Sequence, residues 1–496
     1  MRLRVRVKSD IVVECEPGLN NFSGTNLPTL KERFDRPGAD IDLWTCISLW
    51  NFHGCTTLLI QAVSCRFFAI VFDGGSTGTR LHLYKYVFNT DQHGIPFKVE
   101  EEIFREMKPG LSSYGHNPPG AAASIRSLIQ IAQRTIPVFM WNKTPIAFKA
   151  TAGLRLLPGD MAEDIMIAVE REILESGFFV VPDSVGIMSG SDEGIYGWLT
   201  LNLLLNIFDS GDFKHPNSMK DLHSVAAFDL GGGSTQVTFW PTDQRIFNVY
   251  EDYERDLQFF EYRIRLFTHS FLGNGLVAAR LNALLPTTYN EEELEHQLTT
   301  PCMPADFRLD DWEYALKKWN ISGMEAYSFQ ACYDNARQFV ANSEVMELRS
   351  LRGQVIYLFS YFYDRGLNAE LVKENSGGVV KLLDFKKAAE KACSRTSEQL
   401  EGLHWLPWQC QDLSYIYSLL HDGYGFEDTQ PLFLAKKIKG MVVAWAQGLS
   451  YTLVHEFHKT QMSRVTRQMN ITVVEQIISY IYSSTNNLLS YFNLIS

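Results

Sequence analysis

Two glycine-rich segments of the chain carry a carboxylate, glycines and hydroxyls at matching positions. The first is Asp73-Gly-Gly-Ser-Thr-Gly-Thr-Arg80, and the second is Asp229-Leu-Gly-Gly-Gly-Ser-Thr-Gln236. Glycines let the backbone approach an anion closely, and successive N–H groups in such a turn form an anion-binding nest. One copy alone would be explained as a tight turn with a capping aspartate. Because the pattern occurs twice, it predicts a phosphate-binding site. The hydroxyl donors are Ser76, Thr77, Ser234 and Thr235.

The two aspartates that open these segments indicate a divalent metal ion. Asp73 and Asp229 each follow an apolar run that is typical of a buried strand. A carboxylate at such a place is costly unless it is paired or bound to a metal ion. Two hard carboxylates beside a phosphate therefore predict Mg²⁺ or Ca²⁺, held partly through water.

Hydrolysis of a phosphate also needs a base for water and fixed positive charge. Glu193 lies in a Ser-Asp-Glu-Gly turn before a predicted helix, where a carboxylate can orient water. Asp192 is its competitor, and an ordinary capping acid fits the local sequence equally well. Arg80 and Arg155 carry guanidinium groups that suit phosphate oxygens, although a surface salt bridge is the commoner role of a lone arginine. The block Thr151-Ala-Gly-Leu-Arg155 at a strand end favours a ligand role for Arg155.

The elements that must position these residues form a repeated pattern. A strand, an Asp- and Gly-rich turn, Ser-Thr and a returning strand occur twice, about 160 positions apart. A repeat of this size predicts two similar half-domains, and strands that alternate with helices predict α/β layers. Facing copies would place both turns at one cleft between the halves. The expected strands are 67–72, 81–87, 145–150, 185–188, 225–228 and 237–240, and the expected helices are 121–134, 160–174 and a segment that ends at 205.

Length and composition limit the class of protein. The 496 residues predict two or three domains. Hydrophobic residues make up 46% and charged residues 21%, which excludes a disordered chain, a collagen-like fibre and a polytopic membrane protein. The net charge of -12 argues against general nucleic-acid binding. The sequence contains neither a GxxxxGK[ST] loop nor a GxSxG elbow, which excludes the P-loop class and leaves acyl transfer with little support.

The cysteines and the possible glycosylation sites favour a secretory compartment. There are eight cysteines, and no CxxC pair that would suggest zinc. The four later cysteines fall into two sequential pairs, for which disulfides and free buried thiols are both open. Four Asn-x-Ser/Thr sequons, at Asn21, Asn142, Asn320 and Asn470, favour the secretory lumen. The apolar segment 43–63 is interrupted by polar residues and falls below a transmembrane assignment, which leaves membrane anchorage open.

Five blocks in a fixed order resemble the GDA1/CD39 family of nucleoside triphosphate diphosphohydrolases, the apyrases. Besides the two glycine-rich segments they are Ala150–Arg155, Gly190–Gly194 and Trp445-Ala-Gln-Gly448, and the resemblance covers roughly residues 66–458. It implies two ribonuclease-H-like lobes of the actin-like ATPase superfamily around a central cleft. The implied division is 1–65 uncertain or targeting, 66–208 lobe I, 209–435 lobe II, 436–458 a helix that returns to lobe I, and 459–496 an uncertain tail.

The resemblance also implies residue roles. Glu193 would activate the attacking water, and Tyr361 would stack on the nucleotide base, although a core aromatic residue on a strand is an equally good interpretation. The metal ion, Ca²⁺ or Mg²⁺, would be held through water by Asp73, Thr151, Asp229 and Gln236. Phosphate would be bound by Ser76, Thr77, Gly78, Arg80, Gly232, Gly233, Ser234 and Thr235, with Arg155 elsewhere in the cleft.

The soluble, lumenal subgroup of the family, the NTPDase 5/6 type, is the most similar one. The segments Tyr357–Arg365 and Leu420–Phe426 resemble its versions of two late blocks, and its pattern implies the disulfides Cys302–Cys332 and Cys393–Cys410. This implies a monomeric hydrolase of UDP, GDP and IDP in the endoplasmic reticulum, the Golgi or the secreted fraction. A broad apyrase, a nucleotide-switched binding protein of the actin/Hsp70 type and an exopolyphosphatase are the alternatives. The sequence departs from the family pattern at Gly74 and Gln447.

Overall fold

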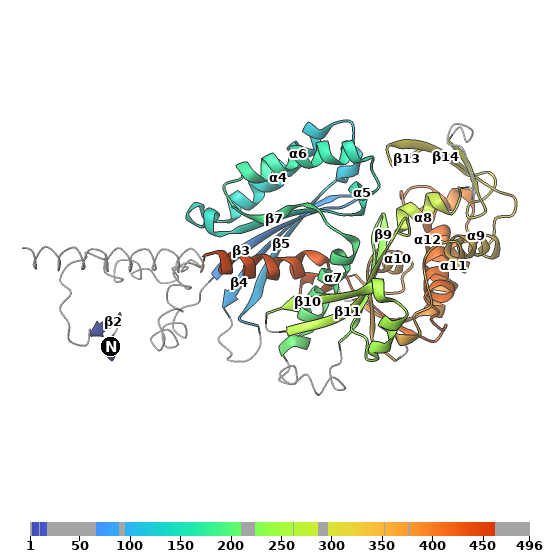
Figure 1. Cartoon of the computed structure of the whole chain (residues 1–496). Coiled ribbons are helices and arrows are strands. Elements are labelled where there is room, and N and C mark those ends of the chain that lie inside the picture. Colours follow the sequence, from blue (N-terminus) through green and yellow to red (C-terminus); the bar gives the residue numbers. More distant parts are fainter. Residues whose placement is uncertain are drawn as a thin grey trace, which may run out of the picture.

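The structure is a computed structural model of the chain (Figure 1). It describes residues 2–8, 10–16, 66–88, 95–209, 224–260, 262–285, 296–351, 353–374 and 377–461. The expectations for segment 43–63, for nearly all of the tail 459–496 and for sequons Asn21 and Asn470 lie outside the described residues. Within the described ranges, no helix combines the length and the apolar character needed to cross a bilayer.

A five-stranded sheet carries the first glycine-rich turn. Its order is β5-β4-β3-β6-β7, with β3 and β4 antiparallel and β3, β6 and β7 parallel. The apolar run of β3 is buried throughout, because both faces of this sheet are covered. Helices α4 and α6 cover one face, and α7 (Gly190–Leu204) with the helix of residues 445–461 covers the other (Figure 1). The bounds are β3 (Arg66–Gly74), β4 (Thr79–Phe88), β5 (Phe97–Met107), β6 (Pro145–Ala150), β7 (Phe179–Ile187), α4 (Pro118–Thr135), α5 (Ala152–Arg155) and α6 (Gly159–Glu175).

A seven-stranded sheet carries the second turn. Its order is β10-β11-β9-β8-β15-β17-β16, and β8 and β9 form the antiparallel pair that corresponds to β3 and β4. Helices α9, α11 and α12 pack together beside it (Figure 1). The bounds are β8 (Ala226–Leu230), β9 (Ser234–Phe239), β10 (Glu254–Phe259), β11 (Tyr262–Leu272), β15 (Ile356–Ser360), β16 (Gly378–Lys381), β17 (Pro431–Leu434), α8 (Leu276–Asn282), α9 (Phe329–Ala341), α10 (Tyr361–Asn368), α11 (Leu382–Ala392) and α12 (Gln409–Ser418).

Two helices form the layer between the sheets. Helix α7 (Gly190–Leu204) packs against β8, β9 and β11, although its sequence lies in the range expected for lobe I. The last helix, residues 445–461, lies along the five-stranded sheet, where Tyr451 packs edge-on against Tyr86 (Figure 1). One buried apolar cluster joins this layer to both sheets, and it includes Phe67, Trp198 and Phe359. The protein therefore has the expected α/β fold of two lobes.

The remaining strands are short or peripheral. A three-stranded sheet has the order β12-β14-β13, and two further pairs are antiparallel. Their bounds are β1 (Arg2–Lys8), β2 (Asp10–Glu16), β12 (Gln297–Thr300), β13 (Arg308–Tyr314), β14 (Lys317–Gly323), β18 (Lys437–Ile438) and β19 (Met441–Val442).

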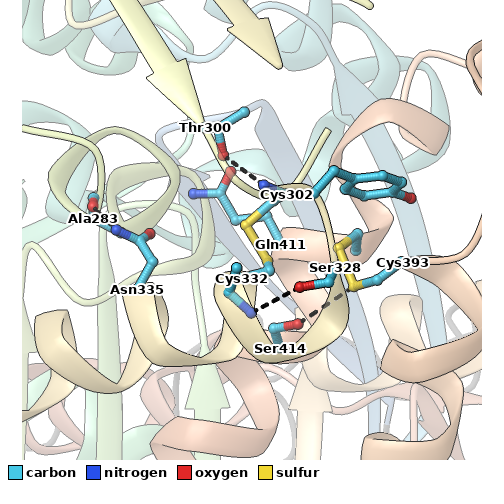
Figure 2. The surroundings of a disulfide bond; sticks show 12 residues. Ala283, Thr300, Cys302, Ser328, Cys332, Asn335, Cys393, Gln411 and Ser414 are labelled. Carbon is cyan, nitrogen blue, oxygen red and sulfur yellow. Dashed lines mark hydrogen bonds between the residues drawn. A yellow bond between two sulfur atoms is a disulfide. The ribbon is translucent and has the colours of Figure 1, made fainter. Parts of the chain in front are cut away.

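Two disulfides lie side by side in the second lobe (Figure 2). One joins Cys302 to Cys332 in α9, and the other joins Cys393, after α11, to Cys410 in α12. The sulfur atoms of Cys302, Cys332 and Cys410 lie within 4.8 Å of one another. One bond therefore fastens α9 to the segment that follows β12, and the other fastens the end of α11 to α12.

Candidate active site

Both glycine-rich turns line a single cavity of about 360 Å³. The loop after β3 and the loop after β8 approach so closely that a Cβ atom on Gly232 would lie 2.3 Å from Ser76 Oγ. A Cβ atom on Gly153 would lie 2.7 Å from the Cα atom of Ser76. At Gly232 the contact is with a side chain that can rotate, whereas at Gly153 it is with the backbone of the first loop, which an added Cβ atom would displace. Of the predicted residues, those that line the cavity are Asp73, Ser76, Thr77, Arg80, Thr151, Glu193, Asp229, Gly232, Gly233, Ser234 and Tyr361.

The two aspartates each present an oxygen without a partner. Asp73 Oδ2 accepts a hydrogen bond from Arg80 at 2.9 Å, while its Oδ1 is buried and has no hydrogen-bond partner. Asp229 lies beside Ser360 at the ends of two paired strands, and the Ser360 hydroxyl lowers the pKa of this carboxyl. Asp229 Oδ1 is likewise buried without a partner. Burial raises the pKa of Asp229 to about 6. Two free hard oxygens at the wall of one cavity fit a divalent cation such as Ca²⁺ or Mg²⁺.

Glu193 and Asp192 have different surroundings, although they are neighbours in the first turn of α7. Asp192 is exposed and accepts a hydrogen bond from Ser189, the N-cap residue. Glu193 is only 8% exposed and faces the cavity. Its Oε2 lies 2.7 Å from Nη2 of Arg155 and 3.2 Å from Nε2 of Gln236. Burial raises the pKa of Glu193 to about 8, while Arg155 opposes this shift. The geometry thus favours Glu193 over Asp192 as the group that meets a bound water.

Both arginines contact carboxylates in the cleft. Arg80 lies between Asp73 and Glu106, with N–O distances of 2.9 Å to each. Burial lowers the pKa of Arg80, but the two carboxylates outweigh burial and raise it above its ordinary value. Arg155 contacts Glu193 and also donates to Ser234 Oγ at 3.3 Å. Arg155 is therefore close to the second loop without lining the cavity.

Three further predicted residues, Gln236, Thr235 and Gly78, lie behind the cavity wall and contact residues that line it. Gln236 Nε2 donates to Ser234 Oγ at 2.6 Å and to Ser270 Oγ at 3.0 Å, and its Oε1 is buried without a partner. Thr235 Oγ1 donates to the backbone carbonyl of Asp229 at 2.9 Å, which holds the turn together. Gly78 lies against the Glu106 carboxylate, where a Cβ atom would be 2.9 Å away.

The opposite wall of the cavity is built by the start of α10. Tyr361 is the first residue of this helix and is partly exposed, so it is not a core aromatic residue on a strand. The Arg365 guanidinium lies 5.7 Å from the centre of its ring. The cavity residues that the sequence reasoning did not identify are Gly75, His82, Phe104, Glu106, Lys108, Ala152, Gly231, Ser360, Asp364, Arg365, His404, Lys436, Val442, Val443, Ala444 and Trp445.

His82 belongs to a buried chain of contacts at the cavity. Its Nδ1 lies 2.8 Å from Glu102 Oε1, and Glu102 Oε2 accepts a hydrogen bond from Val442 N at 2.7 Å. Both side chains are almost fully buried. These contacts fasten the segment that enters the last helix to strands β4 and β5. The alternation in β4, which puts Arg80 and His82 on one face, was the signal that could have identified His82.

Comparisons with known proteins show which family the chain resembles. A sequence model of the GDA1/CD39 (nucleoside phosphatase) family matches residues 61–469. Nucleoside-diphosphatase uda-1 of Caenorhabditis elegans is 56% identical over 440 residues, which cover 87% of this chain and 92% of that protein. Nucleoside diphosphate phosphatase ENTPD5 of Homo sapiens is 35% identical over 398 residues, which cover 80% and 89%.

The solved structure of a nucleoside triphosphate hydrolase from Neospora caninum has the same fold, with a TM-score of 0.53 at 15% identity. The match covers 80% of this chain and 94% of that one. At this identity the likeness concerns the fold, whereas the sequence matches identify the family. With the five ordered blocks gathered around one cavity, the chain belongs to the GDA1/CD39 (nucleoside phosphatase) family.

Proposed function

We propose that this protein hydrolyses nucleoside diphosphates, with UDP, GDP and IDP preferred, to a nucleoside monophosphate and phosphate. The observation that carries the proposal is the position of Glu193 in the cavity that both glycine-rich loops line. The loops offer N–H groups and hydroxyls for a terminal phosphate, and the buried carboxylate lies beside them. The names of the relatives from C. elegans and H. sapiens support a diphosphate rather than a triphosphate as substrate.

In this proposal the two loops hold the terminal phosphate and the two aspartates hold the metal ion. Ser76, Thr77 and Ser234 donate to the phosphate oxygens, and the glycines let their backbone N–H groups come close. Asp73 and Asp229 would hold a hydrated Ca²⁺ or Mg²⁺ through their free oxygens, with Thr151 and Gln236 nearby. Such an ion would neutralise charge on the phosphate oxygens.

Glu193 then orients the attacking water and accepts its proton. Arg155 and Gln236 both hydrogen-bond Oε2 of Glu193 from outside the cavity, and these bonds restrain the orientation of the carboxylate. Attack on the terminal phosphorus is in line, breaks the bond to the bridging oxygen and forms no phosphoenzyme. Positioning and charge stabilisation dominate such a step. Tyr361 provides the face on which the base stacks.

The test is phosphate release by the full chain, secreted from a eukaryotic host. UDP, GDP, IDP, ADP, CDP, UTP, ATP, UMP and polyphosphate are each supplied with Ca²⁺, Mg²⁺ or EDTA. We expect metal-dependent release from UDP, GDP and IDP, and a fall of about 10²–10⁴-fold in Glu193→Gln. Asp192→Asn is the matched control, because it changes the neighbouring acid outside the cavity, and it should retain the wild-type rate.

The other outcomes separate the alternatives. Equal turnover of triphosphates and diphosphates would replace the proposal with a broad apyrase, and turnover of polyphosphate alone would replace it with an exopolyphosphatase. Wild-type rates in Glu193→Gln would contradict the assigned base. Tight nucleotide binding without release, by folded protein, would leave a nucleotide-switched binding protein.

We also propose that the protein acts as a monomer in the lumen of the secretory pathway. Its two buried disulfides support an oxidising compartment. Asn142 is exposed and is therefore accessible to glycosylation at its sequon. A mobility shift on glycosidase treatment that Asn142→Gln reduces would support this location, and a cytosolic, unglycosylated chain would contradict it.

A further inference from the structure

Ser360 has a backbone conformation that is unfavourable for a residue with a side chain. It is the last residue of β15, and α10 begins at the next residue without a loop between them. Its φ is 56° and its ψ is -127°. A non-glycine residue in this region is strained and is kept where the surrounding structure requires it. Glycine would make the same turn without this strain. The presence of a side chain at position 360 therefore has to be explained by a contact that the side chain makes.

Capping of helix α10 does not explain the serine at position 360. Serine immediately before a helix ordinarily accepts a hydrogen bond from an N–H group of the first turn. Ser360 is the N-cap residue of α10, yet its side chain makes no such bond. The hydroxyl instead lies near enough to Asp229 to lower the pKa of that carboxyl. Strands β15 and β8 are parallel, with Phe359 opposite Asp229, so both residues reach the same edge of the sheet.

Asp229 and Ser360 line the cavity together. Asp229 is 8% exposed, and Oδ1 of its carboxylate has no partner. Asp73 has the same arrangement, because Arg80 holds its Oδ2 and its Oδ1 is free. Each aspartate thus has a polar neighbour, Arg80 or Ser360, and an oxygen that is left for a ligand.

We propose that Ser360 is a positioning residue that orients Asp229 toward the metal ion, as Arg80 does for Asp73. The inference rests on the proposed function, since it concerns the metal ion of that reaction. Residues that orient metal-binding carboxylates commonly change metal affinity by 10–100-fold when they are removed. The tight turn at Ser360 is what brings the hydroxyl to the carboxylate.

The test measures affinity for Mn²⁺ by electron paramagnetic resonance, with the full chain and a methylene-bridged UDP that cannot be hydrolysed. We expect Ser360→Ala and Ser360→Gly each to weaken Mn²⁺ binding about tenfold. Ser360→Gly should unfold at the same temperature as wild type or higher, because glycine adopts the positive φ freely. If Ser360→Gly binds Mn²⁺ more weakly but is as stable as wild type, then Ser360 positions the metal-binding carboxylate and does not merely stabilise the fold.

Ser328→Ala is the matched control. Ser328 caps α9 through a 3.2 Å hydrogen bond from Ala331 N, so its removal should lower the unfolding temperature without changing Mn²⁺ affinity. Asp229→Asn is the reference for loss of the metal site. If Asp229→Asn weakens Mn²⁺ binding and both Ser360 variants stay within twofold of wild type, the positioning role is overturned and the proposed function stands. If Asp229→Asn binds Mn²⁺ as wild type does, both proposals fail.

Discussion

Gly153 illustrates how closely the first phosphate loop is packed. It lies within the short helix α5, where alanine is as acceptable to the backbone as glycine. A Cβ atom at this position would nevertheless lie 2.7 Å from the Cα atom and 3.2 Å from the backbone nitrogen of Ser76. Backbone cannot rotate out of the way as a side chain can, so the added methyl group must move the loop itself.

We therefore expect Gly153→Ala to lower kcat/KM for UDP about 100-fold while the protein stays folded. A displacement of about 1 Å in a group that binds the reacting phosphate has effects of that size. Gly159→Ala is the control, because a Cβ atom there meets nothing within 4 Å. Steady-state kinetics and circular dichroism on both variants are the measurement. An unchanged kcat/KM in a folded Gly153→Ala protein would show that the loop does not need its present position.

For single residues, the sequence predicted which residues belong to the site better than it predicted their roles. Eleven of the residues that it assigned to the site line the cavity. The local sequence left Glu193 and Asp192 open, because the two are adjacent and differ in burial, and only the family resemblance selected Glu193. Ser360 lay inside a recognised block, but its importance depends on a positive φ, which no side-chain pattern encodes.

The elements around the site were largely predictable, because each has a strong period or a clear boundary. The expected strand 145–150 coincides with β6, and the expected helices lie within a few residues of α4, α6 and α7. Strand β7 was predicted from Val185 only, but it begins at Phe179. Pro182 and Asp183, the latter with a φ of 59°, interrupt the strand pattern where the pairing with β6 shifts register. The strand order of the second sheet depends on crossovers that one sequence does not reveal.

The neighbouring disulfides give a prediction at the scale of elements. In Cys393→Ser the partner Cys410 becomes a free thiol, and its sulfur lies within 4.8 Å of both sulfurs of the Cys302–Cys332 bond. Its thiolate can attack that disulfide, which forms a bond to one of these cysteines and releases the other as a thiolate. We expect mass spectrometry of unreduced peptides to find Cys410 paired with Cys302 or Cys332.

Replacement of both Cys393 and Cys410 by serine provides the comparison. This variant leaves no attacking thiol beside the Cys302–Cys332 bond, so that bond should remain native. The cost should be about 3 kcal/mol of stability for a closed loop of this length. Native pairing alone in Cys393→Ser would show that the sulfurs do not reach each other in solution.

The molecule as a whole is held together by the apolar cluster shared between its sheets. His458, in the last helix, lies against the rings of Phe67 and Phe97 in this region, and its Nε2 is buried without a hydrogen-bond partner. Burial, and then the charge of His455, lower the pKa of His458 from 6.5 to about 4. Protonation therefore favours the unfolded chain, and the stability held at neutral pH is lost as the pH falls from 6.5 toward 4.

We expect His458→Phe to flatten this dependence on pH. The ring is kept and the titrating group is removed, so the free energy of unfolding should fall less than in wild type between pH 7.5 and 4.5. The difference has an upper limit of about 3 kcal/mol. Urea unfolding at several pH values measures it, with the exposed His116→Phe as control. Parallel pH curves for wild type and His458→Phe would contradict the assignment.

The position of the last helix has a consequence for biosynthesis. Tyr86 and Phe97 belong to strands made early, yet they pack against Tyr451, which is translated roughly 350 residues later. At 5–20 residues per second that interval is roughly 20–70 s. The aromatic face of β4 and β5 stays uncovered on the ribosome for this time. The first lobe therefore completes its folding only after synthesis of the second.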